Sequence, residues 1–242
     1  MNLIIDQGNA SSKVAVFDGR KLVASFIFKQ FNTETLESLF EKYDFTRGIC
    51  SSVIETGEDI IGYLRSKLPA FIFLDETVAV PVTIGYQTPR TLGKDRLAAV
   101  VGANFLYPGR DVLVIDAGTA ITYELVDKNG KFLGGNISPG MTTRFRALHA
   151  FTEKLPLLSE TEEVPLLGTS TTTAIQAGVI NGILYEMDGY IDNLKKNYPR
   201  LLVFLTGGHS FYFESRLKNS IFADINLVLT GLNRILEYNV ES

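Results

Sequence analysis

Two short segments of this sequence place an aspartate, a glycine and several hydrogen-bonding side chains directly after an apolar run. One reads Asp6-Gln-Gly-Asn-Ala-Ser-Ser-Lys13, and the other reads Asp116-Ala-Gly-Thr-Ala-Ile-Thr122. A turn that contains glycine lets backbone N–H groups approach a phosphate closely, and amide, hydroxyl and lysine side chains add donors. An aspartate at the end of each strand suits a cation or a metal-bound water. One such hairpin alone is more typical of an ordinary Asx turn, but two matching copies favour phosphate binding.

The two segments match at a constant offset of 110 residues, which indicates an internal duplication. Each copy has the pattern of a strand, a tight turn with Asp and Gly, a returning strand and a second turn. We therefore expect two domains, 1–108 and 109–242, with a boundary near 108–111 and a cleft between the two turns. The matching pairs are Leu3 and Leu113, Ile5 and Ile115, Asp6 and Asp116, Gly8 and Gly118, and Ala10 and Ala120.

A third segment, Gly93-Lys-Asp-Arg96, lies where a loop enters an apolar stretch over 96–105 that is expected to be a helix. Asp95 would stand at the N-cap or in the first turn, where free N–H groups and the helix dipole stabilise a carboxylate. Taken alone, this pattern is more typical of a helix cap than of a catalytic acid. Two Gly-rich segments, 134–140 and 205–209, are expected to be loops, and a nucleotide could approach the bare backbone of the second.

The remaining apolar patterns predict alternating helices and strands, as expected for an α/β protein. Further helices are expected over 35–43, 58–68, 141–151, 172–193 (one long or two short) and 225–236, and strands over 48–53, 71–74, 78–82 and 201–205.

Composition excludes several classes of protein. A hydrophobic fraction of 45% in 242 residues excludes wholesale disorder, and a net charge of -4 argues against nucleic-acid binding. A single cysteine, Cys50, and two histidines exclude a disulfide framework, a thiolate metal cluster and a three-His zinc site. With no apolar run of about 18 residues and no basic n-region, we expect a soluble, cytoplasmic protein with no membrane span or secretion signal.

In their order along the chain, these segments resemble the type III pantothenate kinases of the acetate and sugar kinase, heat-shock protein 70 and actin superfamily. The resemblance implies an α/β fold of two duplicated ribonuclease H-like (actin-like ATPase) domains with an interdomain cleft. It also implies ATP-dependent phosphorylation of pantothenate to 4'-phosphopantothenate, the first step of coenzyme A biosynthesis. The motifs that carry it are Asp6-x-Gly-Asn, Gly93-x-Asp-Arg96, Asp116-x-Gly-Thr-Ala-x-Thr122, Gly134-Gly-x-Ile-x-Pro-Gly140 and Thr206-Gly-Gly208.

The resemblance implies a role for each matching residue. Asp95 resembles the family's general base, and Asp116 resembles its ligand for a monovalent cation, K⁺ or NH₄⁺; Mg²⁺ or another divalent ion would accompany ATP. Thr171 resembles a pantothenate contact that the family takes from a neighbouring subunit, so a homodimer is implied. The implied ATP contacts are Asp6, Gln7, Gly8, Asn9, Ala10, Ser11, Ser12, Lys13 and Thr119, and the implied pantothenate contacts are Tyr86, Gly93, Lys94, Asp95, Arg96 and Thr171.

Three positions depart from the family pattern. Ala10 stands where Thr or Ser is usual, Glu124 where Asp is commoner, and Gln7 where a small apolar residue is common. Because none of them touches Asp95, we expect altered nucleotide or cation affinity at most.

Three alternatives stay open from the sequence. The chain could be a nucleotide-binding regulator without catalysis, or another small-molecule kinase or phosphatase of the superfamily, since a fold alone does not fix a substrate. A ribonuclease H-type nuclease is the third, and it would need several carboxylates gathered around two metal ions.

Overall fold

The structure is a computed structural model, and it describes residues 1–54 and 56–240. The chain forms two compact units, each of which is built from separate stretches of sequence. The predicted division between residues 108 and 109 stays a prediction, because these units are defined by which parts of the chain pack together and not by the repeated sequence. The first unit holds Met1–Gly109, Val126–Gly134 and the chain from Asn226 onward, and the second holds Arg110–Leu125 and Gly135–Ile225.

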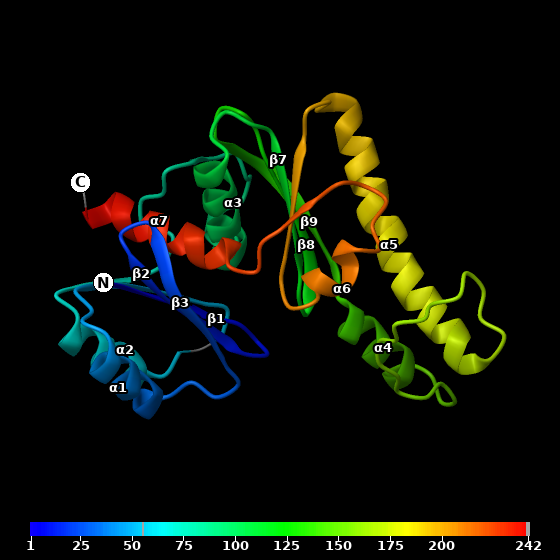
Figure 1. The fold of residues 1–242 in the computed structure, drawn as a ribbon, viewed down its shortest axis with the longest axis horizontal. Coiled ribbons are helices and arrows are strands. Elements are labelled where there is room, and N and C mark those ends of the chain that lie inside the picture. Colours follow the sequence, from blue (N-terminus) through cyan, green and yellow to red (C-terminus); the bar gives the residue numbers. More distant parts are fainter. Residues whose placement is uncertain (55, 241–242) are drawn as a thin grey trace. The chain divides into compact units, whose positions relative to one another are not determined.

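The first unit is built on a five-stranded mixed sheet of strand order β3-β2-β1-β4-β5 (Figure 1). The first three strands form an antiparallel meander, and β4 and β5 continue the sheet in parallel with β1. This is the strand, turn and returning strand that the sequence predicts at Asp6. The strands are β1 (Asn2–Gln7), β2 (Ser12–Asp18), β3 (Lys21–Phe28), β4 (Arg47–Ser52) and β5 (Ala70–Phe73).

Helices cover both faces of this sheet (Figure 1). On one face, α1 (Thr33–Lys42) and α2 (Glu58–Lys67) bury leucines and isoleucines against alternate residues of β1 and β2. The helices α3 (Lys94–Leu106) and α7 (Leu227–Val240) pack on β1 and β4 from the other face. Asn233 of α7 ties this layer together, since its side chain accepts a hydrogen bond from Asn2 (2.9 Å) and donates one to the carbonyl of Gly19 (2.9 Å).

The second sheet has the strand order β11-β10-β7-β8-β9-β6. Its central strand β7 pairs with β8 across the second predicted turn and runs parallel to β10 on its other side. The short strand β6 adds to β9 in parallel, and both of these paired segments belong to the first unit. The strands are β6 (Thr83–Ile84), β7 (Val112–Ala117), β8 (Ala120–Val126), β9 (Lys131–Pro139), β10 (Leu202–Thr206) and β11 (Phe222–Ala223).

Three helices of the second unit cover one face of this sheet: α4 (Met141–Ala150), α5 (Thr171–Asn197) and the short α6 (Ser210–Glu214). The long helix α5 runs along the sheet in Figure 1 and settles the prediction of one long or two short helices in favour of one. Its N-terminus is closed by a capping box, in which Ser170 and Thr173 bond to each other's backbone. No helix within 1–54 and 56–240 has the length and apolar character of a membrane span.

Two predicted elements are wrong. Residues 78–82 form no strand: Asp75 makes a turn by accepting from the backbone N–H of Thr77 (2.8 Å), and Pro81 lacks the N–H that a ladder needs. The Gly-rich stretch 134–140, expected to be a loop, is largely strand β9, which accommodates Gly134 with a φ of 140°. The remaining predicted helices and strands lie within a few residues of observed ones.

Candidate active site

The first predicted phosphate turn joins β1 to β2. The backbone N–H of Gly8 donates to the carbonyl of Ser11 (3.0 Å), so the chain reverses tightly around Asn9 and Ala10. Both of these tip residues are exposed. A turn with exposed backbone and an amide side chain at its tip is suited to hold an anion.

The two residues at the base of this turn, Gln7 and Ser12, are buried. The Gln7 amide oxygen accepts a hydrogen bond from the Thr56 hydroxyl (2.5 Å). This contact explains how a polar residue is accommodated at position 7. The same contact holds the Gln7 side chain inside the first unit. Only the backbone of Gln7 is therefore placed to contact a ligand at the turn.

Asp6 lies in a row of polar residues across three strands. In the sheet register Asp6 is opposite Lys13 of β2 on one side and opposite Ser51 of β4 on the other. Side chains in register share a face of the sheet, so the carboxylate has an ammonium and a hydroxyl as neighbours. Ser51 is fully buried, and its hydroxyl has no hydrogen-bond partner in the described part of the chain.

The second predicted turn, between β7 and β8, is held by the segment that begins α4. The carbonyl of Thr119 accepts from the backbone N–H of Gly140 (3.0 Å) and from the Thr143 hydroxyl (2.7 Å), while the rest of Thr119 is exposed. The Gly134–Gly140 motif therefore ends by supporting this turn. Its two bonds fix the Thr119 backbone and leave the side chain at the tip free to meet a ligand.

Asp116, at the end of β7, is packed against the glycine pair that follows β10. Gly207 has a φ of 94°, and a Cβ there would overlap the Asp116 Oδ1 atom and the backbone of Ala117. The backbone N–H of His209 then donates to the carbonyl of Ala117 (3.0 Å). Only glycine allows this approach, so the contact with the Asp116 strand end explains the first glycine of the Thr206-Gly-Gly208 motif.

The neighbour of Asp116 repeats the arrangement seen at Asp6. Thr206 of β10 is in register with Asp116, as Ser51 is with Asp6, and Thr206 is also fully buried with a hydroxyl that bonds to none of the described residues. The duplication therefore extends to a pair of buried hydroxyls that sequence comparison of the two halves did not identify. Both stand at the carboxyl end of the parallel strand next to the aspartate, which is the pattern that could have revealed them.

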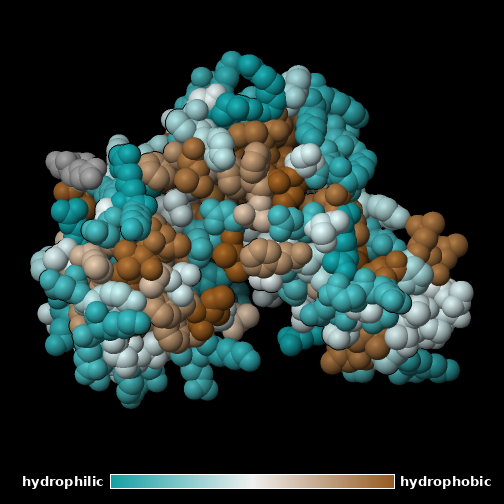
Figure 2. Space-filling model, viewed as in Figure 1, coloured by the Kyte–Doolittle hydropathy of each residue, from teal (hydrophilic) through white to brown (hydrophobic). Residues whose placement is uncertain are grey.

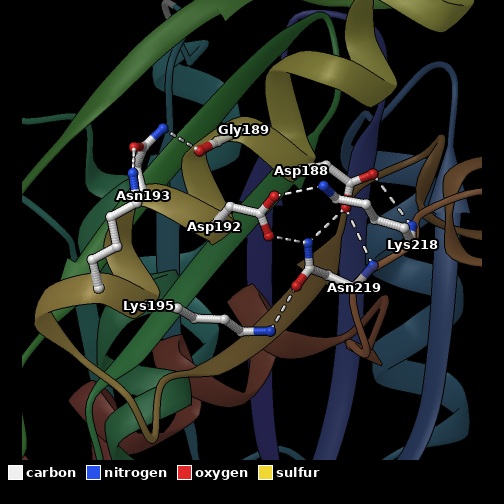
Figure 3. Close-up of polar contacts among 8 residues, drawn as sticks. Asp188, Gly189, Asp192, Asn193, Lys195, Lys218 and Asn219 are labelled. Atoms are coloured by element: carbon white, nitrogen blue, oxygen red, sulfur yellow. Dashed lines mark hydrogen bonds and ion pairs between the residues drawn. The ribbon is translucent and has the colours of Figure 1, made fainter.

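The chain beyond the glycine pair is anchored to α5 by two aspartates (Figure 3). Asp188 accepts from the backbone N–H groups of Lys218 and Asn219 (3.2 Å each) and from the Asn219 side chain (2.8 Å). Asp192 accepts from the Asn219 side chain (3.0 Å) and pairs with the Lys218 ammonium (2.6 Å). These contacts attach the segment between α6 and β11 to α5.

Gly93 and Asp95 lie at the start of α3, as the sequence predicts. Gly93 is the N-cap residue, and Asp95 stands in the first turn, where its Oδ1 atom accepts from the backbone N–H of Arg96 (2.8 Å). Arg96 is only 6% exposed, and its guanidinium carbon lies 5.5 Å from the ring centroid of Tyr86. The structure therefore brings Tyr86 and Arg96 into contact, which their separation in sequence does not reveal.

A half-buried network stabilises the second unit beside the Thr119 turn. Glu186 of α5 pairs with Arg144 of α4 (2.5 Å) and accepts from the hydroxyls of Tyr123 (2.7 Å) and Ser138 (3.1 Å). Burial alone would raise the pKa of Glu186, but the hydrogen bonds from Tyr123, Arg144 and Ser138 lower it below its usual value. Burial and the Glu186 bond raise the pKa of Tyr123, so this phenol stays a donor.

The Glu186→Gln variant should lose about 1–2 kcal/mol of unfolding free energy at pH 7, because the ion pair with Arg144 is replaced by a weaker bond from Arg144 to a neutral amide oxygen. The folded pKa of Glu186 is lowered, so its contribution is present above the usual glutamate pKa and is lost as the pH falls through the folded value. Urea unfolding at pH 7 and pH 3.5 measures both free energies. An equal cost at the two pH values would contradict the assigned pKa direction.

Comparison with known proteins identifies the family. The family model for type III pantothenate kinase matches residues 2–193. The type III pantothenate kinase of Phocaeicola vulgatus is 56% identical over 240 residues, covering 99% of both chains. That of Bacteroides fragilis is 51% identical over 240 residues, covering 99% of this chain and 98% of the relative. The chain belongs to the type III pantothenate kinase family.

Solved structures of more distant proteins agree with the fold of this pantothenate kinase family member. A Campylobacter jejuni protein, provisionally named a conserved Baf family transcriptional activator, superposes with a TM-score of 0.64 at 23% identity over 99% of this chain and all of its own. A glucokinase from an Antarctic psychrotroph gives 0.54 at 12% identity over 98% of both chains. These likenesses concern the fold alone, and they confirm the predicted α/β class of two ribonuclease H-like, actin-like ATPase domains.

Proposed function

We propose that this protein transfers the γ-phosphoryl group of ATP to the primary hydroxyl of pantothenate, the first step of coenzyme A biosynthesis. The observation that carries the proposal is the 56% identity to a type III pantothenate kinase over nearly the whole of both chains. The placement of Gly93 and Asp95 at the beginning of α3 supports it from the site. Phosphoryl transfer depends mainly on alignment and charge neutralisation, which side chains fixed at element ends provide.

Asp95 is the proposed general base. Its Oδ1 atom is engaged by the backbone N–H of Arg96 at 2.8 Å, which fixes the plane of the carboxylate. Oδ2 is then the atom that we assign to accept the hydroxyl proton of pantothenate as its oxygen attacks the γ-phosphorus. Arg96, whose cationic group is buried, would bind the substrate carboxylate or the transferring phosphoryl group.

The two hairpin turns are the proposed binding segments for the ATP phosphates. At the first, residues 6–13 would contribute exposed backbone, the Asn9 and Ser11 side chains and the ammonium of Lys13. At the second, the exposed Thr119 side chain stands on a backbone fixed by Gly140 and Thr143. The buried side chains of Gln7 and Ser12 would support the first turn from inside the unit, and at these two positions only the backbone would contact the phosphates.

The pantothenate pocket is proposed to contain Tyr86 and the stretch from Gly93 to Arg96, including Lys94, together with Thr171 from a second copy of the chain. Thr171 is the first residue of α5 and is exposed. The loop that precedes it displays apolar side chains: Phe151 is 88% exposed, Leu166 75% and Leu167 81%. Figure 2 shows apolar atoms gathered at this end of the second unit. Large exposed apolar side chains suit a protein contact, so we propose a homodimer, which sedimentation analysis would reveal.

The donor sets at the strand ends fit hard cations. Carboxylate and hydroxyl oxygens are suitable ligands for Mg²⁺ and K⁺, and the buried hydroxyls of Ser51 and Thr206 need partners. Asp6 with Ser51 would hold Mg²⁺ or its waters, and Asp116 with Thr206 would hold the monovalent cation. No group of three His, Cys, Asp or Glu is placed to hold a metal in residues 1–54 and 56–240, so substrate oxygens and water would complete each shell. Both ions would neutralise phosphate charge when bound.

The Asp116→Asn variant should weaken the response to K⁺ by about tenfold in the half-saturating concentration, because a neutral amide attracts a cation less than a carboxylate does. K⁺ should also raise the melting temperature of the parent above its value in Na⁺, since a ligand of the folded state stabilises it, and this rise should shrink in the variant. Asp127→Asn, in the turn between β8 and β9, is the control and should keep the parent response. Overlaid K⁺ curves for Asp116→Asn and parent would remove Asp116 from this role.

The proposed function is tested by incubating the purified protein with ATP, Mg²⁺ and pantothenate in K⁺ and again in Na⁺. Formation of 4'-phosphopantothenate that requires K⁺ is the expected result, and it would separate a kinase from a non-catalytic nucleotide-binding regulator. Phosphorylation of a sugar or acetate in place of pantothenate would instead favour another kinase of the superfamily. The family's reaction uses soluble substrates, so we place the protein in the cytoplasm.

A further inference from the structure

The ring of Phe132 on β9 is stacked against the ring of Tyr86. The two rings are almost parallel, with an interplanar angle of 2° and a centroid separation of 5.8 Å. Phe132 is fully buried, whereas Tyr86 is partly exposed. Tyr86 is therefore the more exposed ring of the pair, and Phe132 is the ring buried in the first unit.

The backbone explains why the rings meet. Ile84 of β6 is in register with Phe132 of β9, and the backbone N–H of Gly85 donates to the carbonyl of Phe132 (2.8 Å). Tyr86 follows immediately, so its Cα is fixed relative to the strand that carries Phe132. A buried ring on a sheet strand cannot turn away, and this gives Tyr86 a rigid surface on which to lie.

The Tyr86 ring in turn contacts the side chain of Arg96. The Arg96 guanidinium lies over the Tyr86 ring at 5.5 Å from its centroid, and this cationic residue is 6% exposed. A guanidinium is attracted to the face of an aromatic ring, and its position depends on the ring's plane. Tyr86 therefore contacts two other flat groups, the ring of Phe132 and the guanidinium of Arg96.

We propose that Phe132 is a positioning residue of the pantothenate pocket: it sets the plane of Tyr86 and, through Tyr86, the place of the Arg96 guanidinium. This inference rests on the proposed function, and it adds a residue that the family motifs in the sequence do not include. Phe132 lies 36 positions after Arg96, between the Asp116–Thr122 and Gly134–Gly140 motifs and within neither of them. It should affect the binding of pantothenate more than the chemical step, because its ring stacks on Tyr86, a proposed pantothenate contact, and not on the proposed base.

The first test compares Phe132→Leu with Phe17→Leu. Phe17 of β2 is also buried in the first unit, at 1% exposure, so both variants lose one core ring and should lose similar thermal stability. Phe132→Leu should raise the KM for pantothenate about tenfold with kcat within about threefold of the parent and the KM for ATP unchanged, the pattern of lost substrate binding. Phe17→Leu should leave the KM for pantothenate unchanged. Equal values in the two variants would overturn the proposal.

The second test asks whether Phe132 acts through Tyr86. Tyr86→Leu should raise the KM for pantothenate, and adding Phe132→Leu to it should cause little further rise, since the ring that Phe132 orients is already gone. Tyr86→Phe keeps the stack, so Phe132→Leu should retain its full effect in that background. Independent, multiplying effects of Phe132→Leu and Tyr86→Leu would contradict an action of Phe132 through Tyr86. If Phe132→Leu does not fold, Phe132→Met, whose longer and more flexible side chain adapts better to the space of the ring, is measured in its place.

Different results would overturn the proposed function and the positioning role of Phe132. A parent protein that does not phosphorylate pantothenate would overturn the proposed function and this inference with it. A parent that phosphorylates pantothenate, combined with an unchanged KM in the Phe132 variants, would overturn the positioning role alone.

Discussion

Replacing Asp95 with asparagine should lower kcat by about 10²–10⁴-fold, the usual contribution of a general base. Asparagine keeps the size of the side chain, and its oxygen can still accept the 2.8 Å hydrogen bond from the backbone N–H of Arg96. It cannot accept the hydroxyl proton of the substrate. The KM for pantothenate should change far less than kcat, because the other residues assigned to substrate binding are intact. Steady-state kinetics with a product-specific assay measure both constants.

The chain offers a matched control for this substitution in Asp59. Helix α2 begins like α3, with a glycine N-cap (φ -58°, ψ 140° at Gly57; φ -56°, ψ 132° at Gly93) followed two residues later by an aspartate in the first turn. Asp59→Asn therefore removes the same charge from the same helix position in the same unit, away from the proposed chemistry. It should cost only the modest dipole interaction and leave kcat unchanged. A kcat near the parent value in Asp95→Asn, or an equal loss in Asp59→Asn, would remove Asp95 as the base.

Much of the site could be predicted because its residues are local in sequence. The hairpins at Asp6 and Asp116 are short-range structures whose turn chemistry is written in consecutive residues, and the placement of Asp95 follows from a loop that enters an apolar helix. The duplication was visible for the same reason, since it repeats one contiguous motif at a fixed offset.

The rest depends on contacts between distant segments, which periodicity does not encode. Ser51 and Thr206 can be assigned to the site only once the register places them beside the two aspartates. Likewise, residues 134–140 look like a loop by composition, but pairing within the second sheet makes most of them strand β9. Tertiary pairing overrides local preference in such stretches. The stack of Phe132 on Tyr86 is hidden in the same way, because it arises from a two-residue strand, β6.

The contact between α3 and α7 also could not be foreseen, although it positions the helix that carries Asp95. Gly102 of α3 faces Gly231 of α7, and a Cβ at Gly231 would overlap the carbonyl oxygen of Ala98 and lie 2.9 Å from the backbone nitrogen of Gly102. All of these atoms belong to the backbone, so a flexible side chain cannot give way. The helices approach as closely as they do because both positions lack a side chain.

Gly231→Ala should therefore destabilise the first unit by about 3 kcal/mol, the upper part of the usual range for overpacking, although alanine is the better helix former. For a chain of this size we expect the melting temperature to fall by about 6–12 °C. Gly62→Ala in α2 is the matched control, since Gly62 is exposed and a Cβ there meets no atom within 4 Å. It should raise stability by about 0.5–1 kcal/mol.

Calorimetry of the two glycine variants gives the comparison directly. Opposite signs are expected for one chemical change made at two helical glycines, because helix propensity acts at both sites and steric overlap at only one. Activity in Gly231→Ala should fall along with stability, since a displaced α3 would move Asp95 and Arg96 at its first turn. A melting temperature at or above the parent value in Gly231→Ala would show that α3 and α7 can separate without cost, and that their close approach does not hold the proposed base in place.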